Sequence, residues 1–297
     1  MANERDTLQL PAVWMPTTIE KAVALKKQYG TDATYSAGAT LLQLQWQNNR
    51  PIPNHLISLE QIPELQEFKI EEKQVRIGAI TRLSLLRSDL SLQAALPCIA
   101  DAVKSIAAPA VRNRGTIGGN IMGGEGDLIP LLLALQANMI FLDGDSLIKM
   151  EISEWLKQRQ SMHDALLVQL TIPADPDTDV FYRKLGRREA FTAAIVTVAG
   201  KLEWVEDDRI NLASLAVGGG MNQPTPLEKA ECYLTGKTLE MIDWKAVYQF
   251  VLAEFSPTTD AFLTGDYKKK VAANLIVSEL QRLTSAKAQR KEQVYEV

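Results

Sequence analysis

One stretch of sequence constrains the fold of this chain more than any other. Residues 111–121 read Val-Arg-Asn-Arg-Gly-Thr-Ile-Gly-Gly-Asn-Ile, which places Gly115, Gly118 and Gly119 close together. Glycine tolerates a positive φ and allows another backbone to approach closely. Successive amides in such a turn can point into one concavity and bind an anion, for example a diphosphate. The stretch therefore predicts either a tight turn alone or a turn that binds a phosphate group.

A second turn of small residues lies earlier in the chain. Residues 36–40 read Ser-Ala-Gly-Ala-Thr and precede the apolar pair Leu41 and Leu42. Two such turns predict one extended, phosphate-bearing ligand held between them, with main-chain amides near Gly38 and Gly118 converging on a single diphosphate. Neither turn has the Gly-x-x-x-x-Gly-Lys-Ser/Thr of a nucleoside-triphosphatase loop or the Gly-x-Gly-x-x-Gly of a dinucleotide-binding doubly wound domain. Both could also be ordinary tight turns of an α+β protein.

Composition excludes several classes of protein. A chain of 297 residues and 32.9 kDa is long enough for a full core divided into two or three lobes. The net charge of −4 gives no reason to expect nucleic-acid binding. We find no apolar run of the roughly 20 residues that span a bilayer and no secretory signal, so we expect a cytoplasmic protein. The two cysteines, Cys98 and Cys232, form no Cys-x-x-Cys pair, which argues against an iron–sulfur cluster or structural zinc in this chain.

Hydrophobic periodicity in the first part of the chain predicts mixed helices and strands. We expect a helix at 17–29, which Thr18 can cap and Gly30 ends. Pro97 must fall in the first turn of a helix or produce a kink. Strands are expected at 34–36, 56–59, 75–78, 139–142 and 166–172, and further helices at 83–86, 92–106, 128–137 and from 152.

The acidic, turn-rich segment 175–179 predicts a domain border. The strands expected beyond it, at 180–185, 195–205 and 209–217, form an antiparallel sheet with a hairpin turn at 206–208. Helices are expected at 226–234, 242–254 and 267–285. The last residues, 286–297, are polar and of mixed charge, and we expect them to fray.

Taken together, five segments resemble a known family: the FAD-binding medium subunits of molybdenum hydroxylases, such as xanthine dehydrogenase and carbon monoxide dehydrogenase. The resemblance extends from about residue 8 to about residue 285. The segments follow in the family's order: the glycine motif at 112–121, the helix that begins at Asp127, the basic segment 182–189, residues 218–220 with 224–226, and Asp260 followed by 267–269.

This resemblance implies an α+β fold of the PCMH or vanillyl-alcohol-oxidase type. Two subdomains, 1–60 and 61–174, would clasp FAD, and a small C-terminal domain of antiparallel sheet plus helices, 175–285, would precede the polar tail 286–297. The resemblance also implies a role in a hetero-oligomeric complex. Electrons would pass from a [2Fe-2S] subunit, supplied by a molybdopterin-binding subunit, through FAD to NAD or another acceptor.

The family's cofactor-binding positions carry over to this chain residue by residue. Asp127 would accept from a ligand hydroxyl or fix the loop, Leu167 would lie against the cofactor, and Arg183 or Lys184 would place a cation near the ring. The resemblance implies no catalytic residue and no metal ligand in this chain. The two loops would bind the cofactor through the diphosphate-binding residues Ala37, Gly38, Ala39, Thr40 and Leu41, and through the flavin- and ribityl-binding residues Thr116, Ile117, Gly118, Gly119 and Asn120.

Each assignment has a plainer alternative. Asp127 could simply cap the N-terminus of a helix. Arg183 and Lys184 could belong to a solvated strand face. Leu167 could be an ordinary core residue.

The chain departs from the family pattern in three places. Ala39 and Leu41 replace a glycine and an aspartate of the first motif, and Ala39 adds a Cβ where the turn can require a positive φ. Residues 122–126, Met-Gly-Gly-Glu-Gly, replace a longer loop, and Thr192 replaces an aspartate. These departures motivate a second hypothesis, a diverged scaffold subunit of the same complex with weak or no FAD binding.

A third hypothesis is a stand-alone flavin oxidoreductase of the wider fold. It is less favoured, because neither His55 nor His163 lies in a context that resembles a substrate base.

Overall fold

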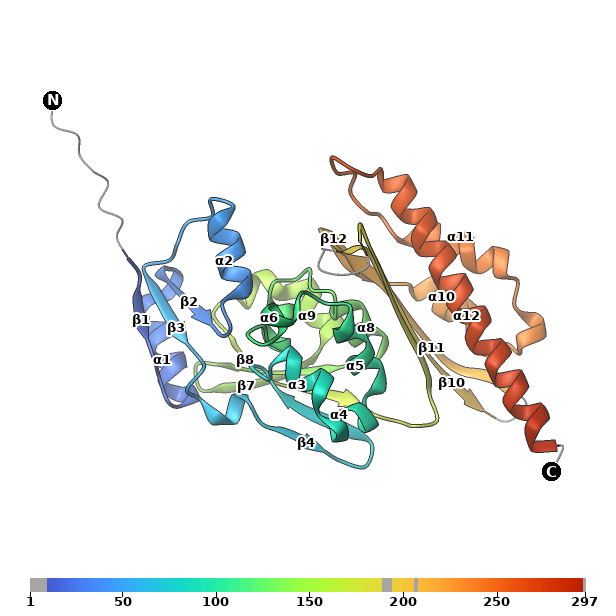
Figure 1. Ribbon diagram of the computed structural model, residues 1–297, viewed down its shortest axis with the longest axis horizontal. Coiled ribbons are helices and arrows are strands. Elements are labelled where there is room, and N and C mark those ends of the chain that lie inside the picture. Colours follow the sequence, from blue (N-terminus) through green and yellow to red (C-terminus); the bar gives the residue numbers. More distant parts are fainter. Residues whose placement is uncertain (1–9, 189–193, 206–207, 296–297) are drawn as a thin grey trace.

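The computed structural model describes residues 10–188, 194–205 and 208–295, which form three sheets and their surrounding helices (Figure 1). Thr192 and residues 206–207 of the expected hairpin turn lie outside the described residues. The sheets succeed one another along the molecule in chain order, from the blue N-terminal part to the orange and red C-terminal helices. The predicted α+β class is confirmed.

The first sheet is parallel, with strand order β1-β3-β2. The helix α1 (Ile19–Tyr29) follows β1 as predicted: Thr18 Oγ1 accepts from Lys21 N at 3.3 Å, and Gly30 ends the helix with a φ of 53°. The sequence analysis missed β1 and also the helix α2, which begins directly after the first small-residue turn. The remaining elements of this subdomain are β1 (Ala12–Trp14), β2 (Ala33–Ser36), α2 (Thr40–Gln47), β3 (His55–Ser58) and the 3-10 turns η1 (Gly30–Asp32) and η2 (Pro63–Leu65).

The second sheet is antiparallel, with strand order β4-β5-β8-β6-β7. Its strands are β4 (Phe68–Ile70), β5 (Gln74–Gly78), β6 (Asn138–Asp143), β7 (Ser146–Glu151) and β8 (Leu166–Pro173). The helix expected at 92–106 is two helices, because Pro97 starts a new one. The helices that cover this sheet are α3 (Leu83–Ser88), α4 (Leu90–Ala95), α5 (Pro97–Lys104), α6 (Pro109–Arg112), α7 (Ile117–Met122), α8 (Ile129–Ala134) and α9 (Ile152–Gln158), followed by η3 (Arg159–Ser161).

The third sheet is also antiparallel, with strand order β12-β11-β10-β9. Its predicted strands form, and β12 (Asn222–Pro226) is an additional edge strand whose two prolines obscured it in the sequence. The last helix, α12, continues through the polar tail to Tyr295, so the expected fraying is wrong for residues 286–295. The other elements are β9 (Asp179–Gly186), β10 (Ala194–Val205), β11 (Arg209–Gly219), α10 (Glu228–Leu234), η5 (Leu239–Met241), α11 (Trp244–Glu254) and α12 (Gly265–Tyr295).

Both faces of the third sheet are covered. Along β11, Leu215 and Val217 belong to the core under α10, α11 and α12, whereas Ala216 belongs to the core that contains α8. This alternation follows from the two-residue period of a strand. A small residue on the α8 side allows that helix to lie close to the sheet. The core of the preceding domain therefore continues into the C-terminal domain.

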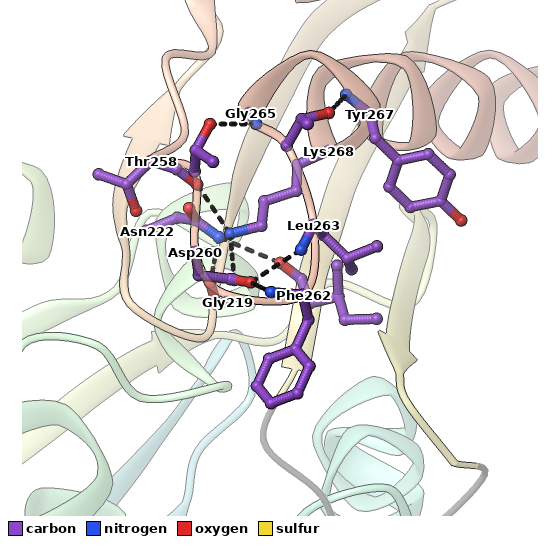
Figure 2. A network of polar contacts seen from close by, with 12 residues as sticks. Gly219, Asn222, Thr258, Asp260, Phe262, Leu263, Gly265, Tyr267 and Lys268 are labelled. Carbon is purple, nitrogen blue, oxygen red and sulfur yellow. Dashed lines mark hydrogen bonds and ion pairs between the residues drawn. The ribbon is translucent and has the colours of Figure 1, made fainter.

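A polar network fixes the loop before α12 (Figure 2). Asp260 Oδ1 accepts from the amides of Phe262 and Leu263 at 2.8 and 2.9 Å, and Asp260 Oδ2 lies 2.6 Å from Lys268 Nζ. Lys268 is 3% exposed and also donates to Thr258 O at 2.8 Å. The hydrogen bond from Lys268, then those from the two amides, lower the pKa of Asp260 to about 2. The network gives a structural role to Asp260 and to Lys268, which both belong to the last of the five sequence segments noted above.

Because the pKa of Asp260 in the folded chain lies below its usual value near 4, this carboxylate stabilises the fold above about pH 4. That contribution is lost as the pH falls from about 4 to about 2. Asp260→Asn should therefore lower the melting temperature at pH 7 and flatten its dependence on pH in that window. Asp266→Asn is the control, because Asp266 forms an exposed pair with Lys270. Equal pH profiles for the wild type and Asp260→Asn would contradict this role.

Candidate functional site

The two small-residue turns touch through their backbones. A Cβ on Gly38 would lie 1.7 Å from Arg114 O and 3.1 Å from Gly115 N, so a side chain has no room there. In addition, Arg114 Nε lies 3.3 Å from Gly38 O, to which it donates a hydrogen bond. The folding of two subdomains thus brings together the two turns that the sequence analysis singled out.

The first turn leads directly into a helix. Ala37 follows β2, Ala39 has the left-handed φ of 56° and ψ of 8°, and α2 begins at Thr40. No described residue accepts a hydrogen bond from the amides of Gly38, Ala39 or Thr40. A left-handed residue at a helix N-terminus directs successive amides to one side, where the helix dipole also favours an anion. This turn fits one end of a diphosphate. The expected positive φ at position 39 is confirmed.

The second turn differs from the expectation. We expected its amides to share the diphosphate with the first turn, but those of Ile117, Gly118 and Gly119 donate to Thr81 O, Ala79 O and Thr116 Oγ1, at 3.0, 2.8 and 3.1 Å. The amide of Asn120 donates to Thr116 O at 3.0 Å. The expectation of a jointly held diphosphate is therefore wrong for this turn. The physical reason is that the residues form the capped first turn of α7, which is hydrogen-bonded to the β5–α3 connection.

The two glycines of α7 have different surroundings. A Cβ on Gly118 would lie 2.5 Å from Ala79 O, so packing alone requires glycine at that position. Among the described residues outside its own helix, a Cβ on Gly119 would meet within 4 Å only Thr116 Oγ1, at 3.1 Å. The side of α7 at Gly119 is consequently open to a flat ligand group, while the side at Gly118 is closed by protein.

Leu41 and Asn120 both contact the glycine-rich loop that follows α7. Leu41 Cδ2 lies 2.7 Å from the position that a Cβ on Gly123 would occupy. Leu41 therefore makes an apolar contact at the position where the family has an aspartate. Asn120 Oδ1 accepts from Leu128 N at 3.1 Å, and a Cβ on Gly126 would lie 1.9 Å from Asn120 O. Both turns are thus tied to the loop 123–126.

Asp127 does not cap a helix. The N-cap position of α8 is Leu128, and no side chain caps it. Instead, Asp127 Oδ2 lies 2.7 Å from Lys184 Nζ, and Asp127 O accepts from Tyr182 OH at 3.3 Å. The capping alternative for Asp127 is therefore wrong.

Strand alternation separates the two candidate cations. Lys184 points toward Asp127 at the end of the loop 123–126 and also donates to Ser105 O at 3.0 Å. Arg183 points to the other face of the sheet, where its Nε lies 2.5 Å from Glu279 Oε1 of α12. Lys184 alone of this pair is beside Asp127, and its side chain is 6% exposed, so the solvated-strand alternative does not hold for it. Leu167 lies in β8, is 3% exposed and packs in the main core.

Sequence reasoning missed Tyr182 as a member of this group. Burial, followed by the charge of Asp127, raises the pKa of the Tyr182 hydroxyl above its ordinary value, so the hydroxyl stays protonated and can donate. The signal was present in the sequence, because residues 182 and 184 of one strand share a face.

Comparison with known proteins shows the family to which the chain belongs. Residues 7–175 match the model described as the FAD binding domain in molybdopterin dehydrogenase, and residues 180–283 match the CO dehydrogenase flavoprotein C-terminal domain. The chain belongs to this family of FAD-binding medium subunits. It is an oxidoreductase subunit of a molybdenum dehydrogenase complex.

Individual relatives cover most of the chain. The carbon monoxide dehydrogenase medium chain of Hydrogenophaga pseudoflava is 32% identical over 88% of this chain and 92% of its own length. The 6-hydroxypseudooxynicotine dehydrogenase complex subunit alpha of Paenarthrobacter nicotinovorans is 25% identical over 89% and 91%. A solved structure of the Hydrogenophaga pseudoflava carbon monoxide dehydrogenase has a TM-score of 0.84 at 28% identity, with 90% of this chain and 95% of that chain covered. In the described part of the chain, no helix is both long and apolar enough to cross a membrane.

The left-handed conformation of Ala39 allows a direct test. Ala39→Gly should raise the free energy of unfolding by about 1 kcal/mol, because the Cβ that disfavours this conformation is removed. Ala37→Gly is the matched control, because Ala37 has no positive φ, and it should lower that free energy by about 0.5–1 kcal/mol. Urea unfolding of both variants measures the difference. A loss of stability in both would show that position 39 is not strained.

Proposed function

We propose that this chain binds FAD between its two turns and transfers electrons within a molybdenum hydroxylase complex. Electrons would arrive from a [2Fe-2S] partner subunit, supplied by a molybdopterin-binding subunit, and leave to NAD or another acceptor. The observation that carries the proposal is the group of free amides at Gly38, Ala39 and Thr40, positioned against Arg114 of the second turn. Bound FAD supplies the ability to take up and release one or two electrons.

The residues of this chain would bind and orient the cofactor. Ala37, Gly38, Ala39 and Thr40 would bind the diphosphate, with Leu41 closing the turn against Gly123. The open side of Gly119 would receive the flavin or ribityl group, while Thr116, Ile117, Gly118 and Asn120 hold α7 in place. Asp127 and Lys184 would border the cofactor as a neutral pair. Leu167 would support the site from the core, whereas Arg183 contributes through Glu279 rather than through the ring.

The arrangement of the two cysteines supports a [2Fe-2S] cluster in a partner subunit rather than in this chain. Cys98 is half-buried with a pKa raised to about 11 by burial, and Cys232 is exposed elsewhere, so the two do not form a cluster site. A relative is named as a subunit of a dehydrogenase complex. We propose the same organisation here, in the cytoplasm, with 1–174 as the FAD-binding domain (subdomains 1–60 and 61–174), 175–285 as the C-terminal domain and 286–297 as a polar tail.

A second candidate function is a scaffold subunit with weak FAD binding. Two observations favour it: Ala39 is held at a φ of 56°, and Leu41 makes an apolar contact in place of a polar one. The purified chain distinguishes the candidates. About one FAD per chain, with flavin absorbance, supports the electron-transfer subunit, and a colourless chain that does not take up added FAD supports the scaffold.

Gly119→Val tests the open side of α7. The valine side chain would fill the space left by glycine, so FAD content should fall at least tenfold while the circular dichroism spectrum stays unchanged. Ala94→Val is the control, because Ala94 is an exposed residue of α4. A valine at that position lowers the helix propensity through the same β-branched side chain, but lies outside the proposed site. If Gly119→Val retains its FAD, the flavin does not lie against α7.

A further inference from the structure

Asp127 is held at two points by one strand of the other domain. Lys184 Nζ contacts its carboxylate at 2.7 Å, and Tyr182 OH contacts its carbonyl oxygen at 3.3 Å. Both side chains come from β9, and we call Asp127, Tyr182 and Lys184 the interdomain clamp. Lys184 Nζ additionally donates to Ser105 O, the C-cap residue of α5, at 3.0 Å. The clamp therefore connects β9 with α5 and with the start of α8.

The clamp is largely shielded from water. The side chains of Lys184 and Asp127 are 6% and 15% exposed. Removal of one partner of such a pair leaves an uncompensated buried charge, which is strongly destabilising. Lys184 also lies at the C-terminal end of α5, where the helix dipole favours a cation. The position of Asp127 is thus determined from the C-terminal domain.

The strand that carries the clamp is itself fixed from both faces. Next to Lys184, Arg183 pairs with Glu279 of α12 on the opposite face of the sheet. A rigid β9 can hold Asp127 at a defined place. A mobile strand would instead move together with the loop that ends at Asp127.

Asp127 ends the loop that borders both turns of the proposed flavin site. Gly126 lies against Asn120 O, and Gly123 lies against Leu41. Asn120 Oδ1 also accepts from Leu128 N, directly after Asp127, at 3.1 Å. A displacement of Asp127 would consequently shift the residues that contact α7 and the start of α2.

We propose that the interdomain clamp positions the flavin-binding loops, so that FAD affinity depends on two positioning residues, Tyr182 and Lys184, of the C-terminal domain. This inference rests on the proposed function. Both residues act through Asp127 and the loop 123–126.

The chain provides a matched control in Lys201. Like Lys184, Lys201 projects from the same face of this sheet, and its side chain is 6% exposed. Its Nζ reaches Gln136 Oε1 of the other domain at 3.2 Å and Glu203 Oε1 at 2.9 Å. Gln136 follows the C-terminal end of α8, whereas Asp127 precedes the N-terminal end. Lys201 is therefore a buried interdomain lysine at the far end of α8 from the flavin loops.

The test compares Lys184→Met, Tyr182→Phe and Lys201→Met in the full chain. Equilibrium titration with FAD measures the dissociation constant, and thermal unfolding without FAD measures stability. Both lysine variants should lose stability. Lys184→Met should raise the dissociation constant at least tenfold and Tyr182→Phe about threefold, whereas Lys201→Met should stay within about twofold of the wild type. Tyr182→Phe is informative because it removes one hydroxyl without changing any charge.

The possible outcomes separate the two proposals. If the wild type does not bind FAD, the proposed function fails. If the wild type binds FAD and the three variants bind it equally well, or equally poorly, the clamp inference alone fails. A reduction potential at saturating FAD that is unchanged in Lys184→Met supports a positioning role. A shifted reduction potential in Lys184→Met, together with normal FAD affinity in Tyr182→Phe, would assign Lys184 to the flavin itself and overturn the inference.

Discussion

The site depends on the direct contact between the backbone of Gly38 and that of Arg114 and Gly115. This contact joins two subdomains at a place where a single methyl group would meet a carbonyl oxygen at 1.7 Å. Because the backbones touch, the start of α2 has a fixed position relative to α7. Under the proposed function, the free amides of the first turn and the open side of Gly119 would then border one cofactor site, although each feature comes from a different subdomain. Close approach of two main chains, rather than any charged side chain, produces this geometry.

The two turns looked alike in the sequence but differ physically. In the first turn, Ala39 adopts a left-handed conformation and leaves the amides before α2 without protein acceptors. In the second turn, Thr116 caps α7, and the amides of Ile117 and Gly118 donate hydrogen bonds to carbonyl oxygens of the β5–α3 connection. The capping role of Thr116 could be predicted from the sequence, since threonine is a preferred N-cap residue. The acceptors on Thr81 and Ala79 were not, because they come from a strand connection that only the tertiary fold places there.

Local signals predicted the parts of the fold that local interactions determine. Thr18 and Gly30 marked the ends of α1, and Pro97 marked the start of α5. Short strands were missed even where their partner is near in the sequence: β4, β7 and β12 each pair with the neighbouring strand of the chain, whereas β1 pairs with the more distant β3. The two prolines of β12 also weakened its strand signal. In the site, the resemblance supplied the residues. It could not separate Arg183 from Lys184, since that distinction requires the register and the two covered faces of the sheet.

The basic segment of β9 shows why buried sheet faces matter for function. In a strand with one solvated face, Arg183 and Lys184 would place at least one cation in water, where it could attract an anionic partner. Here the exposed cation is Arg183, whose side chain is 52% exposed and pairs with Glu279, whereas the side chain of Lys184 is 6% exposed and requires Asp127 as a partner inside the protein. Lys184 therefore contributes little unpaired positive charge on the side of the loop 123–126. Under the proposed function, Lys184 would affect the cofactor mainly through the position of Asp127, so that the packing of the C-terminal domain would influence the cofactor-binding surface of the other domain.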